Sequence, residues 1–299
     1  MRLLDVFAAE PALFIGACLV VGVLIGSFLN VVIHRLPVML ERQWRIECAQ
    51  WAGDALPAPP AEPFNLVAPR SACPACHAPI TAWQNIPLAS YLALGGRCAA
   101  CRARISARYP LVEALTGLMS AAVAWRFGFG AATLAALLLT WFLVALAFID
   151  IDTQYLPDNL TLPLLWLGLL VSLWGVTATN APIPVDLRSS VAGALAGYLS
   201  LWSVYQLFRL ATGKEGMGYG DFKLLAALGA WLGWQLLLPI VLVAAGVGAV
   251  VGALQLWIQG RDRATPLAFG PYLAASGWLM LFCGHEVVAR YFGFFAARP

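Results

Sequence analysis

Lys214-Glu215-Gly216-Met217-Gly218-Tyr219-Gly220-Asp221-Phe222-Lys223 is the stretch around which this chain is organised. Its three glycines alternate up to one carboxylate, Asp221, and an almost unbroken apolar run over residues 224–257 follows. Glycine lets the chain bend and lets backbones approach closely, so the segment is predicted to bring Asp221 to the start of a membrane helix. An ionisable residue in such a place is a functional-site hypothesis and needs a named partner. The candidate partner is Asp150, which ends another apolar run.

The composition is that of a polytopic membrane protein. Of the 299 residues, 61% are hydrophobic and 11% are charged, and the mean hydropathy is +0.80, which excludes a soluble domain of this size. Residues 11–33 carry no charge and exceed the roughly 20 residues that cross a bilayer. This first segment is too long for a signal-peptide core and lacks a basic region before it.

The apolar segments predict an all-α fold of about eight transmembrane helices, with a small zinc-binding cytoplasmic insert between the first two. The expected division is 1–37 for the first helix, 38–109 for the insert and 110–299 for a seven-helix membrane domain. The first helix is expected at about 13–34. The second runs from 110 to a turn at 127–130, and the third runs from that turn to Asp150. The fourth and fifth are expected at 157–176 and 189–210, the sixth begins at the glycine stretch, and the last two are expected at 237–257 and 269–288.

The basic residues predict the orientation. Arginines concentrate in the polar segment between the first two helices, and cytoplasmic loops carry the excess of Lys and Arg. Arg209, Lys214, Arg261 and Arg263 fall on the same side in this topology. The N-terminus is then outside, and Asp150 and Asp221 both lie at the cytoplasmic membrane boundary. The net charge of +3 says little about partners, and no nucleic-acid partner is expected.

The insert contains two Cys-x-x-Cys pairs at an offset of 25 residues, within repeated segments. Four thiolates with this spacing are typical of a tetrahedral structural Zn²⁺ site, and a reducing cytoplasm argues against the alternative of two disulfides. His77 is interpreted as a bystander. The predicted metal ligands are Cys73, Cys76, Cys98 and Cys101.

Other polar residues near the helix ends have alternative interpretations. Glu113 is expected in the first turn of the second helix, where a carboxylate either favours the helix dipole or is functional. Asp158 follows Pro157 and is expected to cap a helix start. Asn30 and His34 share one helix face, which is either a packing surface or the wall of a site.

Two neighbouring carboxylates cannot both ionise cheaply, so they share a proton, and one acts as a base while the other acts as an acid. Such a pair can direct a water at a peptide carbonyl. The same pair could carry protons or metal in a transporter, or it could only cap helix ends. The sequence physics leaves these three interpretations open.

The motifs together resemble those of the bacterial type IV prepilin peptidases, the membrane aspartic proteases with a Gly-x-Gly-Asp motif. The resemblance runs through nearly the whole chain in order. Its pieces are 26–37, the two cysteine pairs, Asn85-Ile86-Pro87 with Ser90-Tyr91-Leu92, 108–113, Phe148-Ile149-Asp150 with Asp152, Leu156-Pro157-Asp158, 215–223 and Phe269-Gly270-Pro271-Tyr272.

This resemblance implies an endopeptidase of the bacterial inner membrane that removes the leader from prepilins and pseudopilins of type IV pili and type II secretion, cutting after a glycine. It implies that Asp150 and Asp221 are catalytic, with Gly218, Gly220 and Asp152 in support. It also implies methylation of the new N-terminal residue with S-adenosylmethionine. For that cofactor the expected neighbourhood is His34, Arg35, Gly95, Gly96 and Glu113. The rival function is a proton- or metal-coupled transporter, and a non-catalytic assembly factor is a third.

Overall fold

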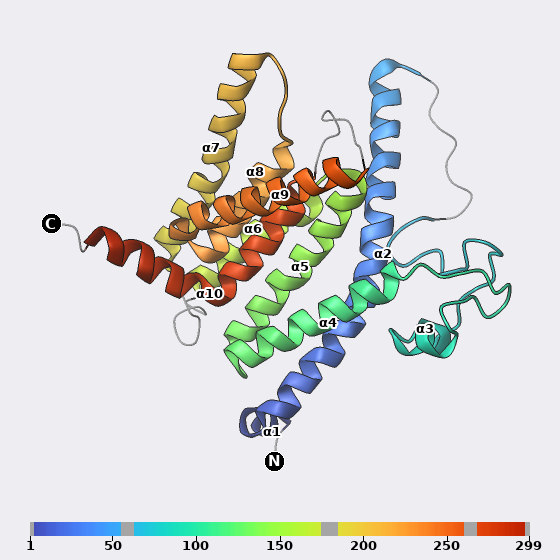
Figure 1. Cartoon of the computed structure of the whole chain (residues 1–299). Coiled ribbons are helices and arrows are strands. Elements are labelled where there is room, and N and C mark those ends of the chain that lie inside the picture. The colour runs from blue at the N-terminus through green and yellow to red at the C-terminus, as the bar shows by residue number, and fades with distance from the viewer. Residues whose placement is uncertain (1–2, 55–62, 175–184, 260–267, 297–299) are drawn as a thin grey trace. The chain divides into compact units, whose positions relative to one another are not determined.

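In the computed structural model, residues 3–54, 63–174, 185–259 and 268–296 are described, and in these ranges the secondary structure is helical, without a strand. The chain divides into two compact units, Met1–Trp125 and Arg126–Pro299. Figure 1 shows their helices. The all-α class predicted from the sequence is confirmed.

The first unit is built on α2, Pro11–Ala52, which follows the short α1, Leu3–Ala9. The expected end near His34 is wrong, because the 42-residue helix continues through Pro37 to Ala52, where Gly53, with a φ of +72°, caps it. Proline costs one backbone hydrogen bond, and polar pairs support the later turns, as in the Glu41–Arg45 ion pair. At 1.5 Å per residue α2 is about 63 Å long, so its polar half extends beyond a bilayer core of about 30 Å.

Between α2 and α4 the unit contains only short helices, η1 (Trp83–Asn85) and α3 (Ala89–Ala93). The next long helix, α4 (Arg108–Phe127), packs on α2 through small residues. A Cβ added at Gly26 would lie 2.8 Å from the Cα of Glu113, and one at Gly117 would lie 3.2 Å from the carbonyl oxygen of Leu19. Small residues let membrane helices approach this closely.

The second unit is organised around α8, Tyr219–Leu232, the helix that the glycine stretch opens. Residues 224–232 are all buried, as expected for a helix that is apolar on every side. Around it lie α5 (Ala131–Thr153), α6 (Asp158–Leu173), α7 (Leu187–Thr212), η2 (Trp234–Leu236), α9 (Leu237–Gln259) and α10 (Gly270–Ala296). Of these, α6, α7 and α10 make the broadest contacts with α8, and Figure 1 shows α7 beside it.

The contact between α7 and α8 is a close backbone approach. A Cβ added at Gly197 would lie 2.6 Å from the carbonyl oxygen of Leu225, and one at Gly193 would collide with the carbonyl of Gly229. The hydroxyl of Ser190 donates to the carbonyl of Ala230 at 2.6 Å. A buried hydroxyl and two glycines therefore fix α7 against the helix that carries Asp221.

Five of the described helices are long and apolar enough to cross a membrane, namely α2, α5, α7, α10 and the η2–α9 segment. Because α6 has 16 residues and α8 has 14, they fall short of that length, and the count of eight spans stays a prediction, as does the three-part division of the chain. The end of the helix expected at 157–176, together with Arg261 and Arg263, lies outside the described residues.

Candidate active site and metal centre

Asp150 lies in the last turn of α5, an almost wholly apolar helix. Asp150 is only 4% exposed, and its Oδ2 accepts a hydrogen bond from the backbone N–H of Gly270 at 2.9 Å. The helix does not end at Asp150 as expected. It continues to Thr153, and Gln154, with a φ of +52°, closes it by donating its N–H to the Asp150 carbonyl. The carboxylate is therefore held from another helix start, 120 residues away along the chain.

Asp221 lies in the first turn of α8, where the glycine stretch was predicted to bring it. It is 8% exposed. Gly220 permits a close approach to the α5–α6 connection, since a Cβ there would lie 2.7 Å from the Cβ of Leu156. Gly218 is different, because its φ is −80° and an added Cβ would meet nothing closer than 4.0 Å. The structure gives Gly220 a steric reason to be glycine and leaves open space beside Gly218.

One leucine connects the surroundings of the two carboxylates. Leu156 lies against Gly220 on one side, and its Cδ1 would be 3.1 Å from a Cβ added at Gly270 on the other. The two aspartates therefore belong to one site within the second unit, whereas Asp152 is exposed.

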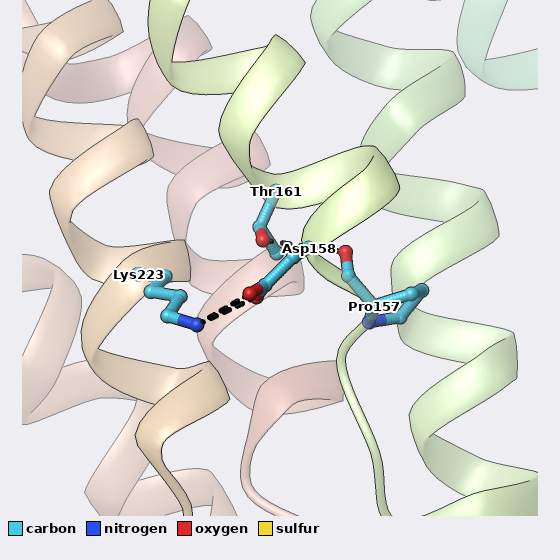
Figure 2. A network of polar contacts seen from close by, with 4 residues as sticks. All are labelled: Pro157, Asp158, Thr161 and Lys223. Atoms are coloured by element: carbon cyan, nitrogen blue, oxygen red, sulfur yellow. Dashed lines mark hydrogen bonds and ion pairs between the residues drawn. The ribbon is translucent and has the colours of Figure 1, made fainter. Parts of the chain in front are cut away.

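Asp158 does not cap α6, contrary to the sequence-based expectation. Pro157 takes the cap position, without a side-chain cap, and the Thr161 hydroxyl donates to its carbonyl at 3.3 Å. The Asp158 carboxylate instead accepts from the Nζ of Lys223, at 2.6 Å to Oδ1 and 2.8 Å to Oδ2. Figure 2 shows this ion pair joining the start of α6 to the first turns of α8.

The cysteine pairs of the insert fold as two copies of one turn. In each copy the N–H of the first cysteine donates to the carbonyl five residues later, Ala78 or Ala103. The residue after the second cysteine has positive φ in both copies, +57° at His77 and +61° at Arg102. An isolated bridge closes each turn, 72 with 79 and 97 with 104. The repeat seen in the sequence is thus a repeat of structure, and His77 has a conformational place in it.

The four thiols of the insert fit a zinc ion. The Sγ atoms of Cys73, Cys76, Cys98 and Cys101 all lie within 4.8 Å of one another, and those of Cys73 and Cys101 are 3.8 Å apart. Tetrahedral coordination with Zn–S bonds of about 2.3 Å requires Sγ atoms about 3.8 Å apart. A disulfide would require about 2.05 Å, and all four cysteines are free.

The electrostatics of the thiols support metal binding. Backbone hydrogen bonds from Cys101 and Ala100 lower the pKa of the Cys98 thiol to about 6. At Cys76 a backbone hydrogen bond from Ala78 acts in the same direction, but contacts with Cys101 and the other thiols outweigh it and raise the pKa to about 11. The cluster thus favours a thiolate at Cys98 and a thiol at Cys76, and a bound divalent cation would favour the thiolate form of all four ligands.

The residues expected near S-adenosylmethionine make contacts of their own. Arg35 donates to the carbonyl oxygens of Asn65 at 2.8 Å and Pro69 at 2.7 Å, so its guanidinium anchors the insert to α2. His34 is exposed. Gly95 and Gly96 have φ of +59° and +67°, and a Cβ on Gly96 would lie 2.9 Å from the Tyr91 hydroxyl. The turn after α3 therefore explains both glycines without a cofactor.

Glu113 is buried at 8% exposure, and its carboxylate accepts from the N–H of Leu88 at 2.8 Å. Because α4 begins at Arg108, Glu113 lies in the second turn, so the expectation of a first-turn residue is wrong. Leu88 has a φ of +57°, unusual for a residue with a side chain. Glu113 thus holds a strained turn of the insert against α4.

Comparison with known proteins identifies the family. Two family models match: the bacterial peptidase A24 N-terminal domain over residues 20–127, and the type IV leader peptidase family over residues 137–253. A prepilin leader peptidase/N-methyltransferase of Stutzerimonas stutzeri is 52% identical to the chain over 295 residues, which is 98% of this chain and 99% of the relative. The chain belongs to the prepilin leader peptidase/N-methyltransferase family.

Other members of this family are as similar. That of Pseudomonas aeruginosa is 52% identical over 98% of this chain and 99% of its own length, and that of Aeromonas salmonicida is 53% identical over 97% of each. No solved structure matches the chain. The resemblance seen in the motifs is confirmed, and the transporter alternative finds no support among these relatives.

Some residues of the site escaped the sequence reasoning. Gly270 lies in a Phe-Gly-Pro motif that indicates no role for it, yet it donates to Asp150. Leu156 and Lys223 also lie in sequence motifs that indicate no function for either residue. The motifs mark all three residues as candidates, but the sequence does not predict their contacts, because the partner of each residue lies far away along the chain.

Proposed function

We propose that this chain is a membrane aspartic endopeptidase that removes the leader peptide from type IV prepilins and N-methylates the new N-terminus. The catalytic pair in this proposal is Asp150 and Asp221. The observation that carries it is the convergence of two buried carboxylates, from the last turn of α5 and the first turn of α8, around Leu156.

The hydrogen bond from Gly270 supports a division of roles between the two aspartates. A carboxylate that accepts an N–H is favoured in its ionised form, so Asp150 is the base and Asp221 holds the shared proton. Asp150 takes a proton from water as the water oxygen bonds to the peptide carbonyl carbon, and Asp221 gives its proton to the carbonyl oxygen. When the resulting diol collapses, its hydroxyl proton returns to Asp221, the C–N bond breaks, and Asp150 protonates the leaving nitrogen.

The placement of the pair suits a substrate with an apolar stem and a polar leader. Both aspartates lie where an apolar helix meets a polar connection, which we assign to the cytoplasmic boundary of the bacterial inner membrane. Peptide bonds in a helix are shielded, and glycine before the cut eases local unwinding. The open space beside Gly218 offers the substrate backbone a close approach to Asp221. Pseudopilins share this stem-and-leader chemistry and are proposed as further substrates.

Zinc has a structural role in this proposal. Cys73, Cys76, Cys98 and Cys101 would hold it, and a bound Zn²⁺ supplies folding free energy to an insert that contains only short helices. Because these four thiols fill a tetrahedral shell, the ion is not expected to take part in peptide cleavage.

For methylation, bound S-adenosylmethionine supplies an electrophilic methyl group for an amine. We keep His34, Arg35, Gly95, Gly96 and Glu113 as the proposed neighbourhood of that cofactor. The contacts described above give four of them roles in shaping the insert, so they do not by themselves form a cofactor cradle. No step of methyl transfer is assigned to a particular side chain.

The test of the peptidase assignment is a cleavage assay in detergent with a prepilin, comparing the wild type with Asp150→Asn and Asp221→Asn. Loss of either group is expected to lower kcat by about 10²–10⁴-fold. Asp54→Asn, which changes an exposed carboxylate of the insert, is the matched control. Products are followed by mass with and without S-adenosylmethionine, and a gain of one methyl group reports the second activity. Full cleavage by either Asp150→Asn or Asp221→Asn would exclude the paired-aspartate mechanism.

A further inference from the structure

We propose that the ion pair between Asp158 and Lys223 positions Asp221 against Asp150, so that both of its members are positioning residues of the peptidase reaction. This inference rests on the proposed catalytic pair. It adds two residues that need not touch the substrate.

The ion pair is bidentate on the carboxylate side. The Nζ of Lys223 contacts both oxygens of Asp158, at 2.6 and 2.8 Å, so the carboxylate is held in one orientation. Lys223 lies two residues after Asp221, and Asp158 is the first residue of α6. The pair therefore sets the distance between the first turn of α6 and the start of α8 (Figure 2).

The start of α8 is the part of this helix that needs such a contact. From residue 224 onward α8 is buried on every side and held by packing. The residues before it, 211–216, are all exposed. Asp221 thus lies at the point where an exposed connection becomes a buried helix, and Tyr219, Gly220 and Lys223 around it are less buried than residues 224–232.

The segment 156–158 contacts α8 at residues on both sides of Asp221 in the sequence. Leu156 lies against Gly220, and Asp158 binds Lys223. The same Leu156 lies against Gly270, whose N–H holds Asp150. One short connection between α5 and α6 is therefore in contact with the supports of both carboxylates.

The pair is not needed to explain the stability of the fold. Its side chains are 28% and 44% exposed, and ion pairs with such exposure contribute little to stability. Placement matters more for catalysis, because a shift of about 1 Å in a reacting group can cost about 10²-fold in rate. A contact of small energetic weight can therefore have a large effect on cleavage.

The experiment measures kcat and KM for prepilin cleavage in the full-length protein with Lys223→Met, Asp158→Asn, the double variant and Lys223→Arg. The exposed Glu41–Arg45 pair, with an N–O distance of 2.6 Å and side chains 57% and 72% exposed, provides the control Glu41→Gln. Methylation of a pre-cleaved pilin peptide and the melting temperature in detergent report whether the variants fold.

The expected result for each single variant is a fall in kcat of about 10²-fold with KM nearly unchanged. Methylation and melting temperature should match those of Glu41→Gln. The double variant should lose no more than either single one, because both changes remove the same contact, and Lys223→Arg should recover most of the rate.

Three results would overturn the inference. Lys223→Met could cleave as fast as Glu41→Gln, kcat could fall only together with methylation and melting temperature, or the two single losses could add in the double variant. Asp221→Asn, run in parallel, separates the two proposals. If Asp221→Asn is inactive while Lys223→Met is fully active, only the positioning role fails. If Asp221→Asn cleaves normally, the catalytic pair itself is wrong.

Discussion

Replacing Gly270 by alanine is expected to impair cleavage without unfolding the protein. Gly270 is the first residue of α10, and its N–H donates to Asp150 Oδ2 at 2.9 Å. A Cβ there would lie 2.6 Å from that oxygen and 3.2 Å from the Asp150 Cγ. Carbon and oxygen atoms in contact prefer at least about 3.3 Å, so the carboxylate must move by about 0.7 Å.

The size of the effect follows from what has to move. A carboxylate at the end of a short side chain can rotate at little cost to the fold, and alanine favours a helix more than glycine does. The reaction is less tolerant, because a displacement approaching 1 Å in a catalytic group costs about 10²-fold, or about 2.7 kcal/mol at 1.36 kcal/mol per factor of ten. We therefore expect kcat/KM for leader removal to fall by about 10²-fold in Gly270→Ala.

The matched control is Gly246→Ala in α9, where an added Cβ meets nothing within 4 Å. Both variants are purified in detergent, and leader removal from a prepilin is timed by mass, with the melting temperature as the measure of folding. Gly246→Ala should cleave like the wild type. If Gly270→Ala cleaves within about threefold of Gly246→Ala, Asp150 does not depend on the close approach of α10, and the assignment of Asp150 as the oriented base is refuted.

Three further predictions concern other parts of the chain. Gly193→Leu should destabilise the protein by about 1–3 kcal/mol or more, because its Cβ would collide with the Gly229 carbonyl. The melting temperature is compared with that of Gly246→Leu, and equal melting temperatures would contradict the packing of α7 on α8. Cys73→Ser should lower the zinc content of the purified protein from about one ion per chain, measured by elemental analysis, whereas Cys48→Ser, which changes an exposed cysteine outside the four-thiol cluster, should retain the metal. Gly96→Ala should destabilise the insert by about 1–2 kcal/mol, because φ is +67° and the Tyr91 hydroxyl is close; protease cleavage in the insert should rise, and resistance equal to the wild type would show that the turn does not need glycine.

Local sequence patterns predicted the parts of the site that depend on neighbouring residues. The glycine stretch placed Asp221 at a helix start, and the apolar run placed Asp150 near a helix end. The offset of 25 between the cysteine pairs predicted two equivalent turns. These features follow from short-range geometry, so spacing alone was enough to find them.

The same local reasoning failed at Pro37, Asp158 and Glu113. A proline usually ends a helix, but the polar residues after Pro37 continue α2, and the extra turns cannot be inferred from that proline. Asp158 had the position of a capping residue, yet Lys223 lies close enough to bind it. Glu113 was misplaced by one turn because α4 starts at Arg108.

By itself the sequence determined that this is a helical membrane protein with two aspartates near helix ends and two Cys-x-x-Cys pairs, because composition, hydrophobic length and motif spacing are properties of the chain. Only the tertiary structure decided which groups lie around the aspartates. Gly270 donates to Asp150, Leu156 lies against both Gly220 and Gly270, and Asp158 binds Lys223. Those partners come from different helices, and their distances depend on how close glycine lets the backbones approach. Periodicity along the chain does not encode that depth of packing.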